Sequence, residues 1–294
     1  MVTMPGLPMF GHGQLEGFEE KYGMEYTKAY KDETPDYDLL ERHKHDIFPL
    51  MKKRYLFSGV EDFFFYDVWS NGSVNENVFA YSNRYGDERA IVFYNNVYNQ
   101  ANGWIQTSCK YAVKDAEGNI HQETKNLCDA LGLSSEPNTY LIFREHRTEK
   151  WYIRRISEIR EKGMFLSLNG FEYQVLMDMS EVKDDATGKY GILCDTLNGA
   201  GVPDIEQALN EIFLKDLYKA LSDFATRDFF VDMVKICNDG KNITKTIGKY
   251  KEKGLKYFET LVDFVNGNYG ADTVLGKDSK INKTPAETAW KALA

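Results

Sequence analysis

The sequence predicts an α+β fold in three consecutive parts: a short α/β segment at the N-terminus, an antiparallel β domain resembling a sandwich, and a helical C-terminal region. The prediction rests on a change in hydrophobic period. Apolar residues recur at helical spacing over residues 37–55, alternate with polar residues in short runs over 56–182, and return to helical spacing beyond 183. We therefore place the three parts at 1–55, 56–182 and 183–294.

Proline and glycine interrupt the first ten residues of the chain. Pro5 and Pro8 exclude a continuous helix or central strand, because each lacks an N–H and pushes the preceding residue out of the α region. Leu7 to Phe10 is a short apolar run that suits a strand buried on both faces, as in a parallel sheet. A glycine-rich polar loop at 11–17 follows directly, and α/β folds carry their sites in loops at this end of a strand.

A helix is expected from Tyr37 to Tyr55. A Thr-Pro-Asp turn at 34–36 precedes it as a cap signal. Pro49 lies deep inside this segment, so we expect a kink or a break there. His43 and His45 suggest a metal site, but side chains two residues apart on a helix point in divergent directions, so no metal is expected.

The middle of the chain is predicted to form strands joined by turns. Val78 to Arg84 and Arg89 to Val97 flank a Tyr-Gly-Asp-Glu turn and predict a β-hairpin. Asn169-Gly170 predicts a second, tight hairpin between the strands on either side of it. Further strands are expected at Glu61–Trp69, Gly103–Val113, Thr139–Arg147, Lys150–Arg154, Met164–Leu168 and Phe171–Met179, and helical inserts at Gln122–Leu131 and Ile156–Lys162.

The last third of the chain is predominantly helical after a polar linker at 183–189. Pro203-Asp204 is a start signal for a helix from Ile205 to Leu214. Two further helical patterns are expected, one ending at Asp239-Gly240 and one running from Ile243 to Val265. The polar stretch that follows ends in a Thr-Pro-Ala-Glu run from Thr284, which can cap a short last helix.

Composition and charge exclude several classes of function. The net charge of -9 argues against a nucleic-acid partner, because phosphate contacts need a clustered basic face. No run approaches the roughly 20 apolar residues of a membrane span, so no membrane partner is expected. The 4 cysteines show no zinc-ligand spacing, and reduced thiols in a cytoplasmic compartment are the simplest interpretation. No cofactor is expected, because the sequence has no phosphate-binding loop and no His-Glu-x-x-His motif.

Two runs resemble the α-amylase family of glycoside hydrolases. Met4 to Gln14, which reads Met-Pro-Gly-Leu-Pro-Met-Phe-Gly-His-Gly-Gln, is similar to the last barrel strand of that family and the turn after it. Val78 to Tyr81, Val-Phe-Ala-Tyr, followed by Gly86 to Val92, Gly-Asp-Glu-Arg-Ala-Ile-Val, is similar to the start of the β-sandwich that follows the barrel. The runs occur in the family's order and at its usual separation, and the resemblance covers Met1 to about Ser108.

The resemblance implies the C-terminal part of an α-amylase-type glycoside hydrolase or glucanotransferase acting on α-glucans, beginning with the last strand and helix of a (β/α)8 barrel. Such chemistry needs two carboxylates flanking the glycosidic bond. By resemblance these lie on barrel strands upstream of Met1, so no catalytic residue is expected in this chain. His12, Gln14 and Glu16 are candidates for contacts with an α-glucan or oligosaccharide, although His12 stands where the family usually has tyrosine. The alternative is a loop whose polar residues only bind one another.

Two other classes of function remain open. A stand-alone carbohydrate-binding module would stack sugars on exposed aromatic rings, and Trp69, Trp104, Tyr98 and Trp151 are candidates for that role. A structural or interaction domain with a helical tail is the other alternative. A parallel-type strand and helix at the N-terminus favour the glycosidase reading, because neither alternative has a reason to begin with them. The sequence leaves the oligomeric state and the choice between hydrolysis and transfer open.

Overall fold

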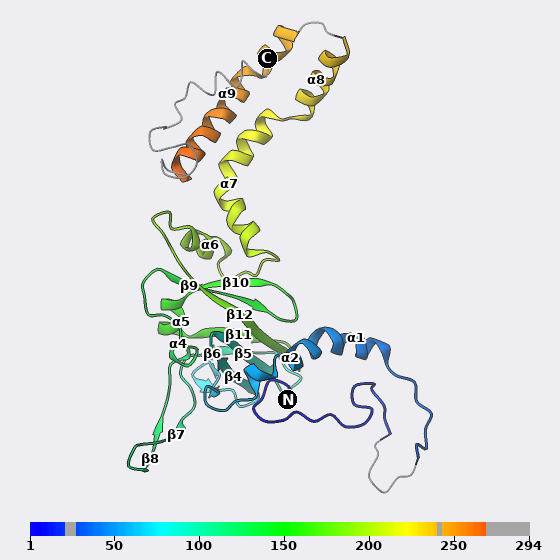
Figure 1. Cartoon of the computed structure of the whole chain (residues 1–294), viewed down its shortest axis with the longest axis vertical. Helices are drawn as coiled ribbons and strands as arrows, with labels where there is room; N and C mark the ends of the chain where they lie inside the picture. Colours follow the sequence, from blue (N-terminus) through cyan, green and yellow to red (C-terminus); the bar gives the residue numbers. More distant parts are fainter. Residues whose placement is uncertain (21–27, 240–242, 269–294) are drawn as a thin grey trace. The chain divides into compact units, whose positions relative to one another are not determined.

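The computed structural model describes residues 1–20, 28–239 and 243–268, which fall into two compact units divided between Glu206 and Gln207 (Figure 1). The first unit contains antiparallel sheets with short helices, and the described part of the second is helical. The mixed α and β content and the antiparallel sheets were predicted. The boundaries at 55/56 and 182/183 divide the chain differently from these units and stay predictions. The helix expected after Thr284 lies outside the described residues.

Residues 7–10 form no strand, which corrects the prediction of a barrel strand there. Leu7 and Met9 are 94% and 81% exposed, and the segment has no regular structure. A strand persists where neighbouring strands pair with its backbone groups. No strand in the described part of the chain runs beside this segment. The barrel remnant is therefore not seen among the described residues.

Three short helices replace the single helix expected at 37–55. They are α1 (Tyr37–Asp46), α2 (Phe48–Lys52) and α3 (Arg54–Phe57). Asp36 caps α1, and its Oδ1 accepts the N–H of Leu39 at 3.0 Å. Pro49 lies in the first turn of α2, where a backbone N–H would have no hydrogen-bond partner within the helix, so its absence costs nothing. The predicted break near Pro49 is confirmed, with Ile47 between the helices.

A six-stranded antiparallel sheet forms the larger layer of the first unit, in the order β1-β4-β5-β12-β9-β10. Tyr85 pairs with Glu88 across a two-residue loop, so the hairpin predicted here is confirmed as β4 and β5. Gly86 has a φ of 60°, a conformation that such a loop requires and glycine adopts without steric cost. The strands are β1 (Phe64–Tyr66), β4 (Val78–Tyr85), β5 (Glu88–Asn95), β9 (Thr139–Glu145), β10 (Trp151–Arg155) and β12 (Tyr173–Lys183).

A four-stranded sheet in the order β11-β6-β2-β3 forms the second layer, and β7 and β8 pair in a separate hairpin. The strand expected at 103–113 is divided between β6 and β7, and residues 106–110 join the two. The strands are β2 (Trp69–Ser70), β3 (Ser73–Val74), β6 (Ala101–Ile105), β7 (Tyr111–Lys114), β8 (Ile120–Glu123) and β11 (Met164–Leu168).

Two local predictions in this region are wrong. Asn169-Gly170 closes no tight hairpin, because β11 pairs with β6 in the smaller sheet while β12 pairs with β5 and β9 in the larger one. The helix expected at 122–131 is mostly absent, since β8 extends to Glu123 and only α4 (Leu127–Ala130) is helical. The Asn126 side chain accepts the N–H of Cys128 as an N-cap, so the helix begins at Leu127 rather than at residue 122. The helix predicted at Ile156–Lys162 is confirmed as α5.

Among the described residues of the first unit, two hydrophobic cores hold the elements together. The larger core lies between the two sheets and contains inward side chains such as Phe93 and Leu166. Successive residues of a strand point to opposite faces, so Val92 faces away from that core. Leu50 of α2 and Phe57 of α3 pack with Val92 in the smaller core. The N-terminal helices therefore cover the outer face of the larger sheet.

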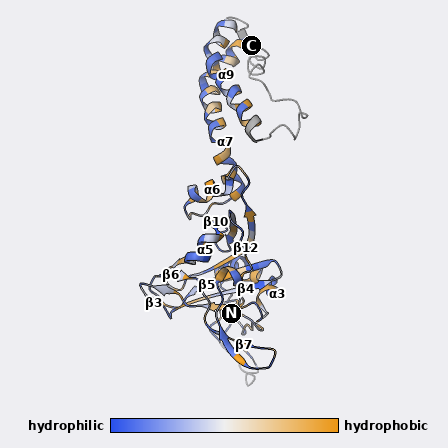
Figure 2. Ribbon diagram, turned by 90° about the vertical axis from the view of Figure 1, so that its left-hand side faces the viewer, coloured by the Kyte–Doolittle hydropathy of each residue, from blue (hydrophilic) through white to orange (hydrophobic). Residues whose placement is uncertain are grey.

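The described part of the second unit is formed by α7, α8 and α9. Hydrophilic and hydrophobic residues are interleaved along α7 and α9 (Figure 2), and Phe224 and Tyr250 are buried where apolar side chains meet. The predicted helix starts at Ile205 and Ile243 are confirmed, but the predicted end at Leu214 is wrong. The first helix, α7, continues to Phe224, and the helical structure is interrupted near Thr226 before α8. No described helix has the length and apolarity needed to cross a bilayer. The bounds of these three helices are α7 (Ile205–Phe224), α8 (Arg227–Asp239) and α9 (Ile243–Asn268). A further helix, α6 (Lys189–Leu197), belongs to the first unit.

Candidate functional site

The three site residues chosen from the sequence lie in one loop, at 11–17. Gln14 Oε1 accepts the N–H of Gly11 at 3.0 Å, and the Gln14 N–H donates to Gly11 O at 3.2 Å. The centroids of the His12 and Phe18 rings lie 6.0 Å apart. His12 and Gln14 are exposed, and Glu16 is half-buried. The loop therefore exposes polar side chains to solvent, and the side-chain oxygen of Gln14 is already used in a hydrogen bond within the loop.

Backbone contacts join this loop to α1. The Asp36 N–H donates to Glu16 O at 2.8 Å, and His43 Nδ1 lies 3.2 Å from Leu15 O. His43 thus faces the loop, whereas His45 bonds the carboxylate at the end of α1, so the two histidines form no joint site. No group of three His, Cys, Asp or Glu side chains among the described residues could hold a metal ion. Whether the loop contacts substrate stays a prediction.

A buried carboxylate lies at the end of α1. Asp46 is 7% exposed, and it accepts hydrogen bonds from His45 Nδ1 at 2.8 Å and from the Tyr173 hydroxyl at 2.7 Å. Buried His146 places Nε2 at 3.0 Å from Asp46 O. Burial raises the pKa of Asp46, but these hydrogen bonds outweigh burial and bring the pKa below its ordinary value. The hydrogen bond to Asp46 raises the pKa of His45. The cluster ties α1 to the larger sheet.

The two runs that resemble the α-amylase family meet in the smaller core: Met4 and Phe10 of the first run pack against this core, which contains Tyr81 and Val92 of the second. Directly before the first run, Thr3 Oγ1 lies 2.7 Å from the Tyr81 hydroxyl, and both residues are buried. The Arg54 guanidinium donates to Met4 O at 3.1 Å and also to Val2 O and Gly6 O. These bonds satisfy backbone oxygens that no sheet or helix pairs. The N-terminal segment is therefore bound to α3 and to Tyr81 of β4 by side-chain contacts rather than by strand pairing.

Three aromatic side chains lie in a row across the solvent-facing side of the smaller sheet. Trp104 on β6 pairs with Phe165 on β11 and with Trp69 on β2, and we call these three residues the aromatic row. Trp69, Trp104 and Phe165 are 52%, 45% and 52% exposed. The Trp104 and Phe165 ring centroids lie 5.2 Å apart, with the ring planes tilted by 56°. Exposed Asn102 and Ser167 pair beside the row on the same face.

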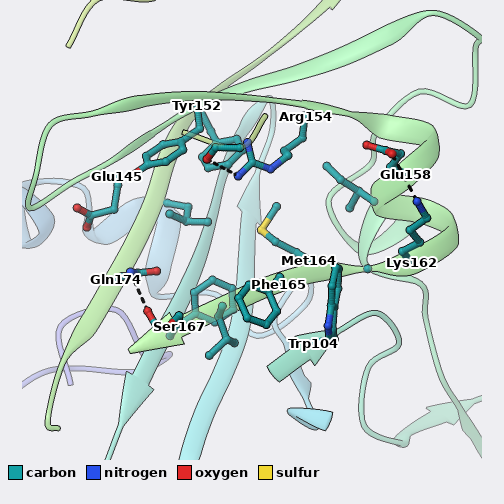
Figure 3. A pocket seen from close by; sticks show the side chains of 17 residues that line it. Trp104, Glu145, Tyr152, Arg154, Glu158, Lys162, Met164, Phe165, Ser167 and Gln174 are labelled. Atoms are coloured by element: carbon teal, nitrogen blue, oxygen red, sulfur yellow. Dashed lines mark hydrogen bonds and ion pairs between the residues drawn. The ribbon is translucent and has the colours of Figure 1, made fainter. Parts of the chain in front are cut away.

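A cavity of about 450 Å³ adjoins this row (Figure 3). Two residues of the row, Trp104 and Phe165, belong to its lining. The polar side chains of the lining include Glu145, Tyr152, Arg154, Glu158, Lys162, Ser167 and Gln174.

The charged groups of the cavity are engaged with the protein itself. Glu145 is 3% exposed, and its carboxylate accepts the N–H groups of Arg147 and Thr148 at 3.1 and 2.7 Å. Arg154 donates to Ile153 O and Gly199 O, and burial lowers its pKa. Glu158 and Lys162 form an ion pair at 3.5 Å. The charged groups of the cavity are therefore held in place by the protein, beside apolar side chains such as Phe143 and Leu176.

The structure brings together two of the four candidate stacking residues. Trp69 and Trp104 are register partners, whereas Tyr98 lies against Phe171 at 6.3 Å and Trp151 belongs to the larger sheet. Phe165 was not singled out from the sequence. The alternation within Met164–Leu168 carried the signal, because it places Phe165 opposite to the buried residues of that strand.

A scan against protein-family models and a search of curated proteins each found no match. Among solved structures, an α-amylase from Geobacillus thermoleovorans, GTA, complexed with acarbose matches with a TM-score of 0.34 and 15% identity, covering 61% of this chain and 31% of that one. A variant of AmyP in complex with maltotriose matches with a TM-score of 0.26 and 15% identity, covering 48% and 20%. The matched region thus spans less than a third of either structure. Both TM-scores are too low to support an inference about function.

Proposed function

We propose that this chain is the C-terminal part of an α-amylase-type glycoside hydrolase or glucanotransferase acting on α-glucans. In this proposal the catalytic carboxylates come from outside the chain. His12, Gln14 and Glu16 contact the sugar, and the sandwich holds the segment that carries them. Gln14 keeps donor capacity at Nε2, because the bond to Gly11 uses Oε1.

One observation carries the proposal: the two runs that resemble this family, far apart in the sequence, meet in a single core. Thr3, directly before the first run, lies 78 positions from Tyr81 and shares a buried hydrogen bond with it. Met4 and Phe10 of the first run pack against the core that contains Tyr81 and Val92 of the second. The family resemblance implies that the last barrel segment and the first sandwich strands are neighbours, and this contact supports that arrangement.

The contacts also explain how a sandwich would position a substrate loop. The larger sheet holds the end of α1 through Tyr173 and Asp46, and the start of α1 holds the loop through Asp36 and Glu16. A loop whose polar side chains are held within a small range of positions is what binding of a sugar requires.

The test compares this chain with the product of the same gene extended by the codons 5′ of Met1. Release of reducing ends from amylopectin and maltoheptaose is measured for both, against heat-killed controls. We expect activity in the extended product and none in the chain alone. Within the extended product, His12→Ala should raise KM for maltoheptaose, while Glu19→Ala, at an exposed position outside the loop, should not. An inactive extended product would refute the proposal in favour of a stand-alone binding or interaction domain. Activity of the chain alone would show that catalytic carboxylates lie within it.

A further inference from the structure

We propose that the aromatic row, with the cavity beside it, is a binding site for an α-linked glucan chain. The choice of α-glucan as ligand class rests in part on the proposed function, whereas the site itself rests on the geometry of Trp69, Trp104 and Phe165. The site holds sugar and takes no part in bond cleavage.

The dimensions of the aromatic row fit a short stretch of sugar. Neighbouring strands lie about 4.8 Å apart, so three rings on three adjacent strands span about 10 Å. That length accommodates two to three sugar units. Each sugar ring has an apolar C–H face that packs against an aromatic ring and a rim of hydroxyl groups that need hydrogen-bond partners. Asn102 and Ser167, exposed beside the row, offer an amide and a hydroxyl for that rim.

The tilt within the aromatic row favours a curved chain over a flat one. The planes of Trp104 and Phe165 meet at 56° rather than lying parallel. Successive rings of an α-1,4-linked glucan turn relative to one another, because the axial linkage makes the chain helical. A β-1,4-linked glucan is a flat ribbon and would require coplanar rings. The geometry therefore points to the α-linked polymer.

The cavity extends the site beyond the edge of the smaller sheet. Trp104, Phe165 and Ser167 belong both to the lining of the cavity and to the exposed face of the smaller sheet. Its volume of about 450 Å³ is within the usual range for small-ligand sites. Tyr152 and Gln174 in its lining carry groups that bond sugar hydroxyls.

A protein partner fits this surface less well. An aromatic side chain buries roughly 150–250 Å², so three half-exposed rings offer on the order of 300 Å². A stable protein interface buries about 800 Å² on each partner. The aromatic row is one residue deep, and the next pair on the same face, Asn102 and Ser167, is polar. Sugar recognition needs no larger apolar area than this.

The experiment measures binding by the purified chain of 294 residues. Native electrophoresis in gels containing amylopectin gives retardation, and calorimetry with maltoheptaose gives Kd. Trp104→Ala removes the central ring of the row. Tyr98→Ala is the matched control, because Tyr98 is an aromatic residue, 84% exposed, outside the row. Ser167→Arg keeps all three rings and places a long charged side chain beside them, so it tests the same surface without opening the sheet.

We expect the wild-type chain and Tyr98→Ala to be retarded equally, and Trp104→Ala and Ser167→Arg to bind maltoheptaose at least tenfold more weakly with unchanged circular dichroism. Cellohexaose should not bind. The proposal is overturned if the wild-type chain is not retarded, if cellohexaose binds as well as maltoheptaose, or if Ser167→Arg binds like wild type. Because no cleavage is measured, this result is independent of the activity of the extended gene product.

Discussion

Replacing Asp46 with alanine tests whether the sandwich fixes the N-terminal helices. The substitution removes the acceptor of two hydrogen bonds, those from the Tyr173 hydroxyl and from His45 Nδ1. It leaves the contact between His146 and the backbone oxygen of residue 46 in place. The Tyr173 hydroxyl, packed against α1, then has no partner at a site that excludes most water.

The expected loss follows from the burial of each bond. A hydrogen bond to a charged acceptor contributes about 1.5–3 kcal/mol, and the Tyr173 bond lies at a carboxylate that is 7% exposed. His45 is 52% exposed at its side chain, so its contribution is reduced by solvent screening. We expect Asp46→Ala to lower the free energy of unfolding by about 2–4 kcal/mol. Urea unfolding followed by tryptophan fluorescence reports mainly on the first unit, which contains Trp69, Trp104 and Trp151 of the 4 tryptophans in the sequence.

The pH dependence separates the two hydrogen bonds. The lowered pKa of Asp46 means that its contribution is present above about pH 4, the unfolded value, and is lost as pH falls through the folded pKa. The raised pKa of His45 means that its contribution is present below about pH 6.5 and is lost as pH rises through its folded pKa. Asp46→Ala should therefore cost more at pH 5.5 than at pH 8.5. Tyr173→Phe, which removes only the hydroxyl, should cost the same at both. A loss under about 1 kcal/mol for Asp46→Ala at pH 5.5 would refute the reasoning.

Two further predictions concern backbone positions and chain exposure. Gly163 has a φ of 85°, and a Cβ there would lie 2.1 Å from Ile105 O, so Gly163→Ala should lower the free energy of unfolding by about 3 kcal/mol or more. Gly72→Ala, with a similar φ of 81° and nothing within 4 Å of the new Cβ, should cost only about 1 kcal/mol, and equal losses would contradict the clash. In amide hydrogen exchange, Leu7 and Met9 should lose protection within the earliest time points, and slow exchange there would mean that the segment pairs with a strand after all.

Local signals determined which parts of the sandwich could be predicted. The β4–β5 hairpin depends on Gly86 in a two-residue loop, and its register follows from that loop alone. The helix at Ile156–Lys162 and the strand at Met164–Leu168 matched because each is a short element with its own period. The partner of each strand is not encoded locally. Asn169-Gly170 has the composition of a hairpin turn, yet it joins two sheets because β11 pairs with β6 and β12 pairs with β5 and β9, which are all distant in the sequence.

The strand predicted at residues 7–10 is wrong for a related reason. Its apolar pattern suits a strand buried on both faces, but a parallel strand gains its stability from neighbours and not from its own residues. Nothing in the run Leu7 to Phe10 specifies whether such neighbours are at hand. For the same reason the sequence did not predict the whole aromatic row, because Phe165 becomes a neighbour of Trp104 only when β11 pairs with β6.

The N-terminal loop depends on the sandwich through a short chain of contacts, and this bears on what the sandwich does in the proposed function. Tyr173 holds Asp46 at one end of α1, and Asp36 at the other end holds Glu16 O. Arg54 binds three backbone oxygens of the first six residues and leaves that segment little freedom to move. A change that loosens α1 therefore releases the loop as well, because the hydrogen bonds that stabilise the helix also position His12, Gln14 and Glu16. The sandwich therefore does more than stabilise the chain: its contacts determine where the loop at 11–17 lies.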